Sequence, residues 1–203
     1  MNKVKLTQGE LKRQRDLLKQ YQRFLPTLQL KKQQIQMELN DQIHALEMHR
    51  DRLNKMALEI TAWMGLLAES SITMNEIVIP RQVIMTSRNV AGVDIPVFDH
   101  VEFVKSDYDL FATPLWLDRA AQSFMHHIAL LFHVEALRQG AELLRRELLT
   151  TTQRVNLFEK IKIPESQENI RRIKIFIGDQ LANGIGRSKL VKRRTMEKQR
   201  EVA

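Results

Sequence analysis

Six histidines give this chain its greatest potential for metal chemistry. His126, His127 and His133 lie near one another in the sequence, as do His44 and His49. A two-histidine metal site on one helix needs a spacing of four residues on a single face, and none of these pairs has it. His49 falls within an apolar repeat, where a single polar side chain commonly fixes helix register. We therefore expect structural or exposed histidines and no metal site.

Two further groups have residue types suited to chemistry but lack the required context. Residues 184–189 (GIGRSK) resemble a phosphate-binding loop, yet they lack the Walker spacing and follow no predicted strand. Asp107, Asp109 and Asp118 could supply an acid and a base, but no nucleophile or apolar pocket is predicted beside them. The absence of cysteine excludes thiolate chemistry. We expect a helix break at residues 184–186, a solvated acidic face, no catalytic residue and no cofactor.

The elements that carry these residues are predicted from long apolar repeats. Between residues 11 and 67, apolar side chains recur at alternating spacings of four and three, which is typical of a coiled-coil helix. Such a helix would be about 85 Å long at roughly 1.5 Å per residue. The apolar positions expected in the seam between helices include Leu39, Leu46, Leu53 and Ile60. The polar positions expected to fix its register are Gln14, Lys32, Gln42 and His49.

A second periodic segment follows Pro114, which suits the first turn of a helix. Its expected seam positions include Leu137, Leu144, Leu148 and Val155. After Pro164 the repeat resumes at Ile170, one position out of phase with the preceding repeat. If the two segments pair as antiparallel helices, we expect Pro26 and Pro164 to lie at the same height and to share a bend.

The segment between these helices has short β-branched runs bounded by Gly and Pro, with a turn expected at Gly92. The predicted fold is mainly α: a long antiparallel two-helix coiled coil with a small β-hairpin-containing head. Three regions are expected: an N-terminal helix at residues 1–68, the head at 69–113, and a C-terminal helix with a basic tail at 114–203. Val93, Ile95, Val97 and Phe98 either anchor a partner at the head or pack the head internally, and both alternatives stay open.

Charge is distributed unevenly along the chain, whose net charge is +8. Residues 1–67 hold twelve Lys/Arg against seven Asp/Glu, residues 68–118 three against eight, and residues 119–203 seventeen against nine. Antiparallel pairing would bring the two basic ends to one tip. Residues 187–200 could bind phosphate backbones, but they lack the aromatic side chains and motifs of nucleic-acid readers. A basic coiled-coil scaffold or nucleic-acid-associated protein is the alternative function.

The sequence predicts a soluble chain. Its N-terminus lacks the uncharged run of a signal peptide, and no stretch approaches eighteen apolar residues without a charge. We therefore expect no direct membrane insertion.

The second helix contains a segment that resembles a known family. Residues 151–164 (TTQRVNLFEKIKIP) are similar to the "RRVNALE…IP" stretch of the D subunit of V-type and A-type rotary ATPases. Residues 89–96 (NVAGVDIP) resemble the "N..GV.IP" turn of that family, and residues 188–192 (SKLVK) its terminal "LKKVK". Ile170, Ile173 and Phe176 continue the likeness. The departure lies at residues 24–28 (FLPTL), where many members have glycine and no proline, which suggests a divergent bacterial branch.

This resemblance implies a non-catalytic central-stalk rotor that transmits torque between the catalytic hexamer of A and B subunits and the ion-translocating membrane ring. Its implied partners are the F subunit, the A and B subunits and the funnel-shaped subunit on the ring, at the cytoplasmic side of the cell membrane. Proton or sodium coupling, and synthesis or hydrolysis as the main direction, stay open. We expect basic residues at the two ends to face acidic surfaces of the hexamer. They are Lys3, Lys5, Lys12, Arg13, Arg15, Lys189, Lys192, Arg193 and Arg194.

Overall fold

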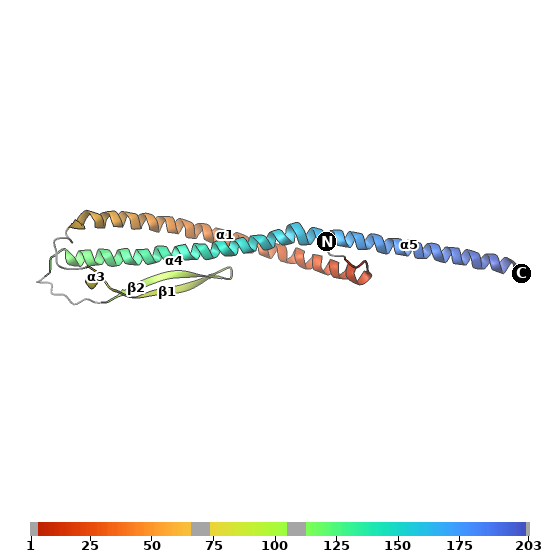
Figure 1. The fold of residues 1–203 in the computed structure, drawn as a ribbon, viewed down its shortest axis with the longest axis horizontal. Coiled ribbons are helices and arrows are strands. Elements are labelled where there is room, and N and C mark those ends of the chain that lie inside the picture. The colour runs from red at the N-terminus through yellow and green to blue at the C-terminus, as the bar shows by residue number, and fades with distance from the viewer. Residues whose placement is uncertain (1–3, 66–73, 105–112, 202–203) are drawn as a thin grey trace. The chain divides into compact units, whose positions relative to one another are not determined.

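The computed structural model describes residues 4–65, 74–104 and 113–201. Along the chain, one long helical segment precedes an antiparallel β hairpin and another follows it, which confirms the predicted fold class (Figure 1). The elements are α1 (Gln8–Trp63), α3 (Met74–Ile77), β1 (Pro80–Val90), β2 (Val93–Phe103), α4 (Leu117–Asn156), the π-helical turn η1 (Leu157–Lys162) and α5 (Ile163–Glu201).

The chain divides into two compact units that share its long helices. Unit 1 comprises Met1–Leu30 and Thr152–Ala203, and unit 2 comprises Lys31–Thr151. Unit 1 therefore holds the first part of α1 with η1 and α5. Unit 2 holds the rest of α1, most of α4 and the hairpin.

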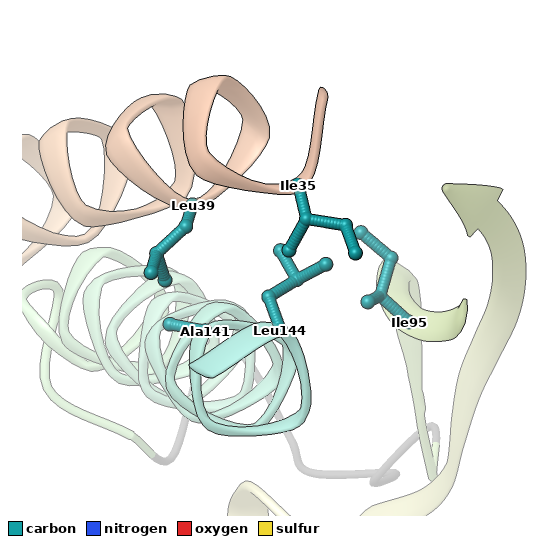
Figure 2. Packing of buried hydrophobic residues seen from close by; sticks show 5 residues of the cluster. All are labelled: Ile35, Leu39, Ile95, Ala141 and Leu144. Carbon is teal, nitrogen blue, oxygen red and sulfur yellow. The ribbon is translucent and has the colours of Figure 1, made fainter. Parts of the chain in front are cut away.

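The main core of unit 2 joins both helices to the hairpin. Ile35 and Leu39 on α1, Ala141 and Leu144 on α4, and Ile95 on β2 form one buried cluster, and Figure 2 shows their side chains converging. Ile35, Ile95 and Leu144 are completely buried. The apolar repeat thus provides two sides of this core, and β2 provides the third.

The turn of the hairpin lies where it was predicted. Ala91 and Gly92 both have positive φ, at 49° and 83°, as a two-residue turn matched to the twist of the strands requires. The Gly92 amide donates to Asn89 Oδ1 at 3.1 Å, and Asn89 Nδ2 donates to Asp94 Oδ1 at 2.6 Å. Glycine accepts its backbone angle readily, whereas Ala91 adopts an angle that is unfavourable for a residue with a Cβ.

The strands are longer than the short runs predicted from the sequence. Each has eleven residues, and a bulge lies between Ile84 and Met85. Pro80 begins β1 and Pro96 pairs with Ser87 inside β2. Each strand of a two-stranded sheet has an unpaired edge, so a proline that lacks its N–H need not interrupt the ladder.

Gly140 marks the point where β2 lies against α4. A Cβ placed on Gly140 would meet Gln42 Oε1 at 3.6 Å, Ile95 Cβ at 3.7 Å and the Pro96 carbonyl oxygen at 4.0 Å. These are ordinary van der Waals distances, so a methyl group fits there and a longer side chain does not. The hairpin packs on α4 because this position has almost no side chain.

Substitutions at Gly140 should therefore distinguish the effect of helix propensity on stability from the effect of packing against β2. Gly140→Ala should stabilise the protein by up to about 1 kcal/mol, because alanine favours the helix and fits the space. Gly140→Leu should destabilise it by roughly 1–3 kcal/mol, because the side chain displaces β2. Urea unfolding followed by circular dichroism measures both. Gly178→Leu on α5 is the control, because nothing lies near that position; an equal response at both glycines would contradict this packing.

A second core of unit 2 lies where the chain leaves α1 and enters α4. Ile77 and Val78 pack with Leu117 and Ala121. The Trp63 ring meets the Phe124 ring edge-on, with centroids 5.9 Å apart. The apolar residues at and after the end of α3 and the aromatic end of α1 therefore stabilise the start of α4.

Unit 1 contains the physical cause of the phase shift noted in the sequence. Val155, Ser166 and Ile173 are buried there. The spacing from Thr151 to Val155 is four, so the repeat should continue with three, four and three and reach residue 165. Ser166 lies one residue beyond that position. A π-helical turn accommodates one extra residue, and η1 lies between Val155 and Ser166. The out-of-phase repeat after Pro164 therefore reflects this π turn.

The predicted shared bend at the two prolines is wrong. Within unit 1, Tyr21 stacks on Phe158 with centroids 5.3 Å apart. That pairing puts Pro26 level with Gln153 and Pro164 level with Arg15, about three turns apart. The predicted register took no account of the packing within unit 1. Helix α1 continues through Pro26.

The predicted helix break near the C-terminus is also wrong. Helix α5 runs from Ile163 to Glu201 and continues through Gly184 and Gly186. Glycine lowers helix stability by about 1 kcal/mol relative to alanine, and the helix-forming residues on either side outweigh that cost. Residues 184–189 are therefore helical and form no phosphate-binding loop.

Candidate partner-binding surfaces

The basic residues proposed to contact a partner lie on unit 1 and are exposed wherever the structure describes them. Lys3 lies outside the described residues. The exposed members of the first group are Lys5, Lys12, Arg13 and Arg15, and those of the second group are Lys189, Lys192, Arg193 and Arg194. We call these the N-terminal basic group and the C-terminal basic group.

The structure does not bring the two basic groups together at one tip. The stacking of Tyr21 on Phe158 puts Gln8, where α1 begins, level with Arg171. Helix α5 continues to Glu201, and Figure 1 shows it extending past the start of α1. The C-terminal basic group therefore lies roughly 30 Å farther along α5 than the level of Gln8.

The outer part of α5 also exposes apolar side chains. Every residue from 178 to 196 is exposed. The large apolar side chains among them are Leu181, Ile185, Leu190, Val191 and Met196, all more than half exposed. A helix that presents both apolar and basic side chains to solvent has a surface suited to contact with another protein.

A groove of about 480 Å³ lies in unit 1 between the first residues of the chain and the region around η1. Lys5, Arg13 and Lys162 contribute positive charge to its lining. Glu10 lies 3.8 Å from Arg13, and Glu165 lies 3.5 Å from Lys162. The N-terminal basic group thus borders a recess with charges of both signs.

The predicted head residues pack mainly against the helices of unit 2. Ile95 is fully buried, Val93 packs on the main core, and Phe98 stacks on His133 with centroids 5.5 Å apart. Val97 is 36% exposed. This arrangement favours internal packing for three of the four residues, and Val97 is the one with a surface open to a partner.

The predicted seam residues are all buried or half-buried. Leu39, Ile60, Leu144 and Val155 are buried. The half-buried members are Leu46, Leu53, Leu137 and Leu148. All eight side chains therefore lie at least partly shielded from solvent.

Two cross-element ion pairs were missed in the sequence. Lys31 Nζ donates to Glu147 Oε1 at 2.7 Å between α1 and α4, and Thr151 Oγ1 donates to the same oxygen at 3.4 Å. Arg88 on β1 pairs with Glu38 on α1. Lys31, Glu38 and Glu147 each lie next to a predicted seam position, but periodicity alone does not show which charges face each other across two elements.

Perturbed carboxylates lie on the outer helix surfaces. Hydrogen bonds from Arg138 and Gln139 lower the pKa of Glu135 to about 2. Hydrogen bonds from Arg171 and Arg172 lower the pKa of Glu168. Pairs spaced three or four residues apart on one helix are common stabilising contacts, so these shifts identify exposed ion pairs and not an active site.

Two of the histidines pack against each other. His49 and His133 are in ring contact across α1 and α4, with centroids 4.1 Å apart. Within the described residues, no group of three His, Cys, Asp or Glu side chains could hold a metal ion. Asp107 and Asp109 of the predicted acidic face lie outside that part of the chain. None of the described helices is long and apolar enough to span a membrane.

These features define a helical protein with a β hairpin packed along paired helices and with charged and apolar helix surfaces suited to binding other proteins. Comparison with known proteins gives the family. The family model for the D subunit of ATP synthase matches residues 10–193, so the chain belongs to the ATP synthase D-subunit family.

Curated relatives agree over nearly the whole chain. The V-type ATP synthase D subunit of Borreliella burgdorferi is 38% identical over 200 residues, covering 98% of both chains. The protein of the same name from Chlamydia muridarum is 29% identical over 206 residues, covering 97% of this chain and 98% of the relative. The one from Chlamydia pneumoniae is 29% identical over 197 residues, covering 94% of this chain and 92% of the relative.

Proposed function

We propose that this chain is the central-stalk rotor subunit of a V/A-type ATPase. It transmits torque between ATP hydrolysis or synthesis in the hexamer of A and B subunits and proton or sodium translocation by the membrane ring. It supplies no catalytic residue and binds no cofactor. The observation that carries this proposal is the family match over residues 10–193 of a chain built from paired long helices.

Packing between the paired helices suits a shaft that must resist twisting. Ile35 and Leu39 interlock with Ala141 and Leu144, and the Lys31–Glu147 pair adds a polar contact between the same helices. A side chain inserted between residues of the facing helix resists sliding and rotation of one helix against the other. Torque applied to one helix would therefore pass to its partner through these contacts.

We assign the proposed partners to the three predicted regions of the chain. Residues 1–68 and 114–203 form the shaft, whose basic groups face weakly acidic surfaces of the A/B hexamer. Residues 69–113 and the nearby helices meet the F subunit and the funnel-shaped subunit on the membrane ring. The chain would act at the cytoplasmic side of the cell membrane as a peripheral subunit, without entering the bilayer and without binding nucleic acid.

Co-expression of the full chain with the F, A and B subunits from the same organism tests this proposal. Gel filtration should yield a one-to-one complex with the F subunit, and that complex should assemble with the A/B hexamer. Failure to bind any of these subunits would reject the rotor function. Tight binding of the isolated chain to bulk DNA or RNA, falling steeply with salt, would instead support the alternative of a nucleic-acid-associated coiled coil.

Neutralising the basic groups should weaken assembly with the hexamer in a salt-dependent way. Glutamine at Lys3 and at every residue of the two basic groups should slow insertion about tenfold at low salt, with the difference disappearing near 1 M salt. Light scattering during mixing measures the rate. The control replaces exposed basic residues of unit 2 by glutamine, at Arg50, Lys55, Arg81, Arg119 and Arg145. Unchanged salt dependence in the first variant would contradict a role for these charges.

A further inference from the structure

Three rings from three different elements form a stack in unit 2, in which His133 contacts the other two. The His49 ring on α1 meets the His133 ring on α4, with centroids 4.1 Å apart and planes inclined by 35°. On β2, the Phe98 ring stacks on the same His133 ring, with centroids 5.5 Å apart and planes inclined by 27°. All three residues are half-buried. His133 therefore connects the hairpin to both helices.

This stack contains a buried polar atom that the described residues do not satisfy. Nδ1 of His49 is buried and has no hydrogen-bond partner among them. Protonation of this ring to the imidazolium form would make Nδ1 a donor without an acceptor, and the cation would lie against a second imidazole. Both consequences are unfavourable in a buried position.

Burial and a neighbouring group lower the pKa of each histidine in the stack. Burial lowers the pKa of His49, and Arg52 on α1 lowers it further. Burial also lowers the pKa of His133, with a further decrease caused by His49. The two rings therefore titrate as a coupled pair, in which the first proton opposes the second.

Nearby carboxylates do not offset these effects. On β2, Asp99 lies 3.1 Å from His100, and both are exposed. On α4, Glu135 accepts hydrogen bonds from Arg138. The exposed carboxylates of α1 nearest in sequence are Glu47 and Asp51, each two residues from His49, a spacing that directs them to other sides of the helix.

The hairpin has a separate attachment near its turn. There Ile95 lies in the main core and Arg88 pairs with Glu38. Farther from the turn, Phe98 contacts His133, and Phe103 at the end of β2 packs against the second core of unit 2. The middle of β2 therefore meets the helices through Phe98, between attachments at Ile95 and Phe103.

We propose that the stack of His49, His133 and Phe98 is a proton-operated latch. When both imidazoles are neutral, the latch holds the middle of β2, residues 97–101, against the helices. Protonation of the pair releases this part while Ile95 and Phe103 keep its two ends in place. The latch makes the hairpin surface depend on pH, and this inference is independent of the torque-transmitting role.

The direction of the pH dependence follows from the lowered pKa values. The open state has histidines with ordinary pKa values near 6.5, so it binds protons more readily than the closed state. The closed state is therefore fully favoured above that pH. It loses stability as the pH falls below 6.5, and the loss is complete below the lowered pKa values of the closed pair.

Two measurements on the full chain test the latch. NMR titration should show His49 and His133 gaining protons at a pH below the ordinary histidine pKa near 6.5. Hydrogen–deuterium exchange, expressed as protection factors to remove the intrinsic effect of pH, should show residues 97–101 losing protection at least fivefold between pH 7.5 and pH 5.5. Protection around Ile95 should change less.

A matched pair of variants identifies the groups responsible. His49→Phe with His133→Phe keeps the aromatic contacts but removes both titrating groups, so protection of residues 97–101 should become independent of pH. His126→Gln alters an exposed histidine of α4 and should leave the fivefold loss intact. Ordinary pKa values for both stacked histidines, or a loss that persists in the double variant, would overturn the latch. The titration uses the unmodified chain, so it decides the matter even if the double variant fails to fold.

Discussion

Leu144→Ala is expected to lower the free energy of unfolding by about 3 kcal/mol, within the range of 2–5 kcal/mol typical of buried leucines. Leu144 is completely buried and packs with Ile35, Leu39 and Ile95 from two other elements. Its truncation would leave a cavity that both helices and the hairpin border. The cost arises from lost apolar burial and from a space that three elements cannot easily close.

Urea unfolding followed by tryptophan fluorescence measures this effect, because both tryptophans of the chain, Trp63 and Trp116, belong to unit 2. Leu143→Ala is the matched control, with the same chemical change at a neighbouring residue whose side chain is 38% exposed. The control should cost less than about 1 kcal/mol. Equal losses at the two leucines would show that the core is not centred on Leu144.

Deletion of Glu159 should be tolerated, although it removes one residue from the middle of a long helix. Glu159 is an exposed residue of η1, whose π turn accommodates one extra residue in the apolar repeat. Its removal would bring Ser166 and Ile173 into phase with Val155 on a regular α-helix. We expect the free energy of unfolding to change by less than about 1 kcal/mol, as for substitutions that leave buried contacts intact.

Deletion of Arg145 is the matched control and should have a much larger effect. Arg145 is also exposed, but it lies in the regular α-helix α4. Its loss would turn following residues such as Leu148 and Thr151 by about 100° relative to those before it. Urea unfolding followed by circular dichroism should show a loss of more than about 4 kcal/mol, because several buried side chains leave the core together. Similar losses for both deletions would contradict the π-turn account of the repeat.

The apolar faces, the hairpin turn and the phase shift could be predicted because each depends on residues close in sequence. The repeat through Leu39 and Leu144 identifies core-facing sides of two helices. Asn89 and Gly92 favour the turn through local backbone and hydrogen-bond preferences. The displaced repeat after Pro164 indicates one extra residue but not the form that it takes, which the structure identifies as η1.

The features that could not be predicted depend on the register between elements that are distant in the sequence, that is, on which residues lie opposite each other. Periodicity shows which side of a helix is apolar, but it does not fix the partner of Tyr21, and so the two prolines were placed at one level. It also does not indicate that α5 extends past α1 or that Phe98 reaches His133. These contacts depend on side-chain shape and on competing ways to bury the same surface. The partner-binding role of the basic groups stays a prediction.

Direct observation of rotation tests the central proposal. The natural chain has no cysteine, so one introduced by Thr86→Cys on the exposed surface of the hairpin provides a single attachment point for a bead. In a complex of this variant with the F subunit and an immobilised A/B hexamer, addition of ATP should drive continuous rotation of the bead in one direction. A bead that stays fixed while the same complexes hydrolyse ATP would contradict the role of this chain as the rotor.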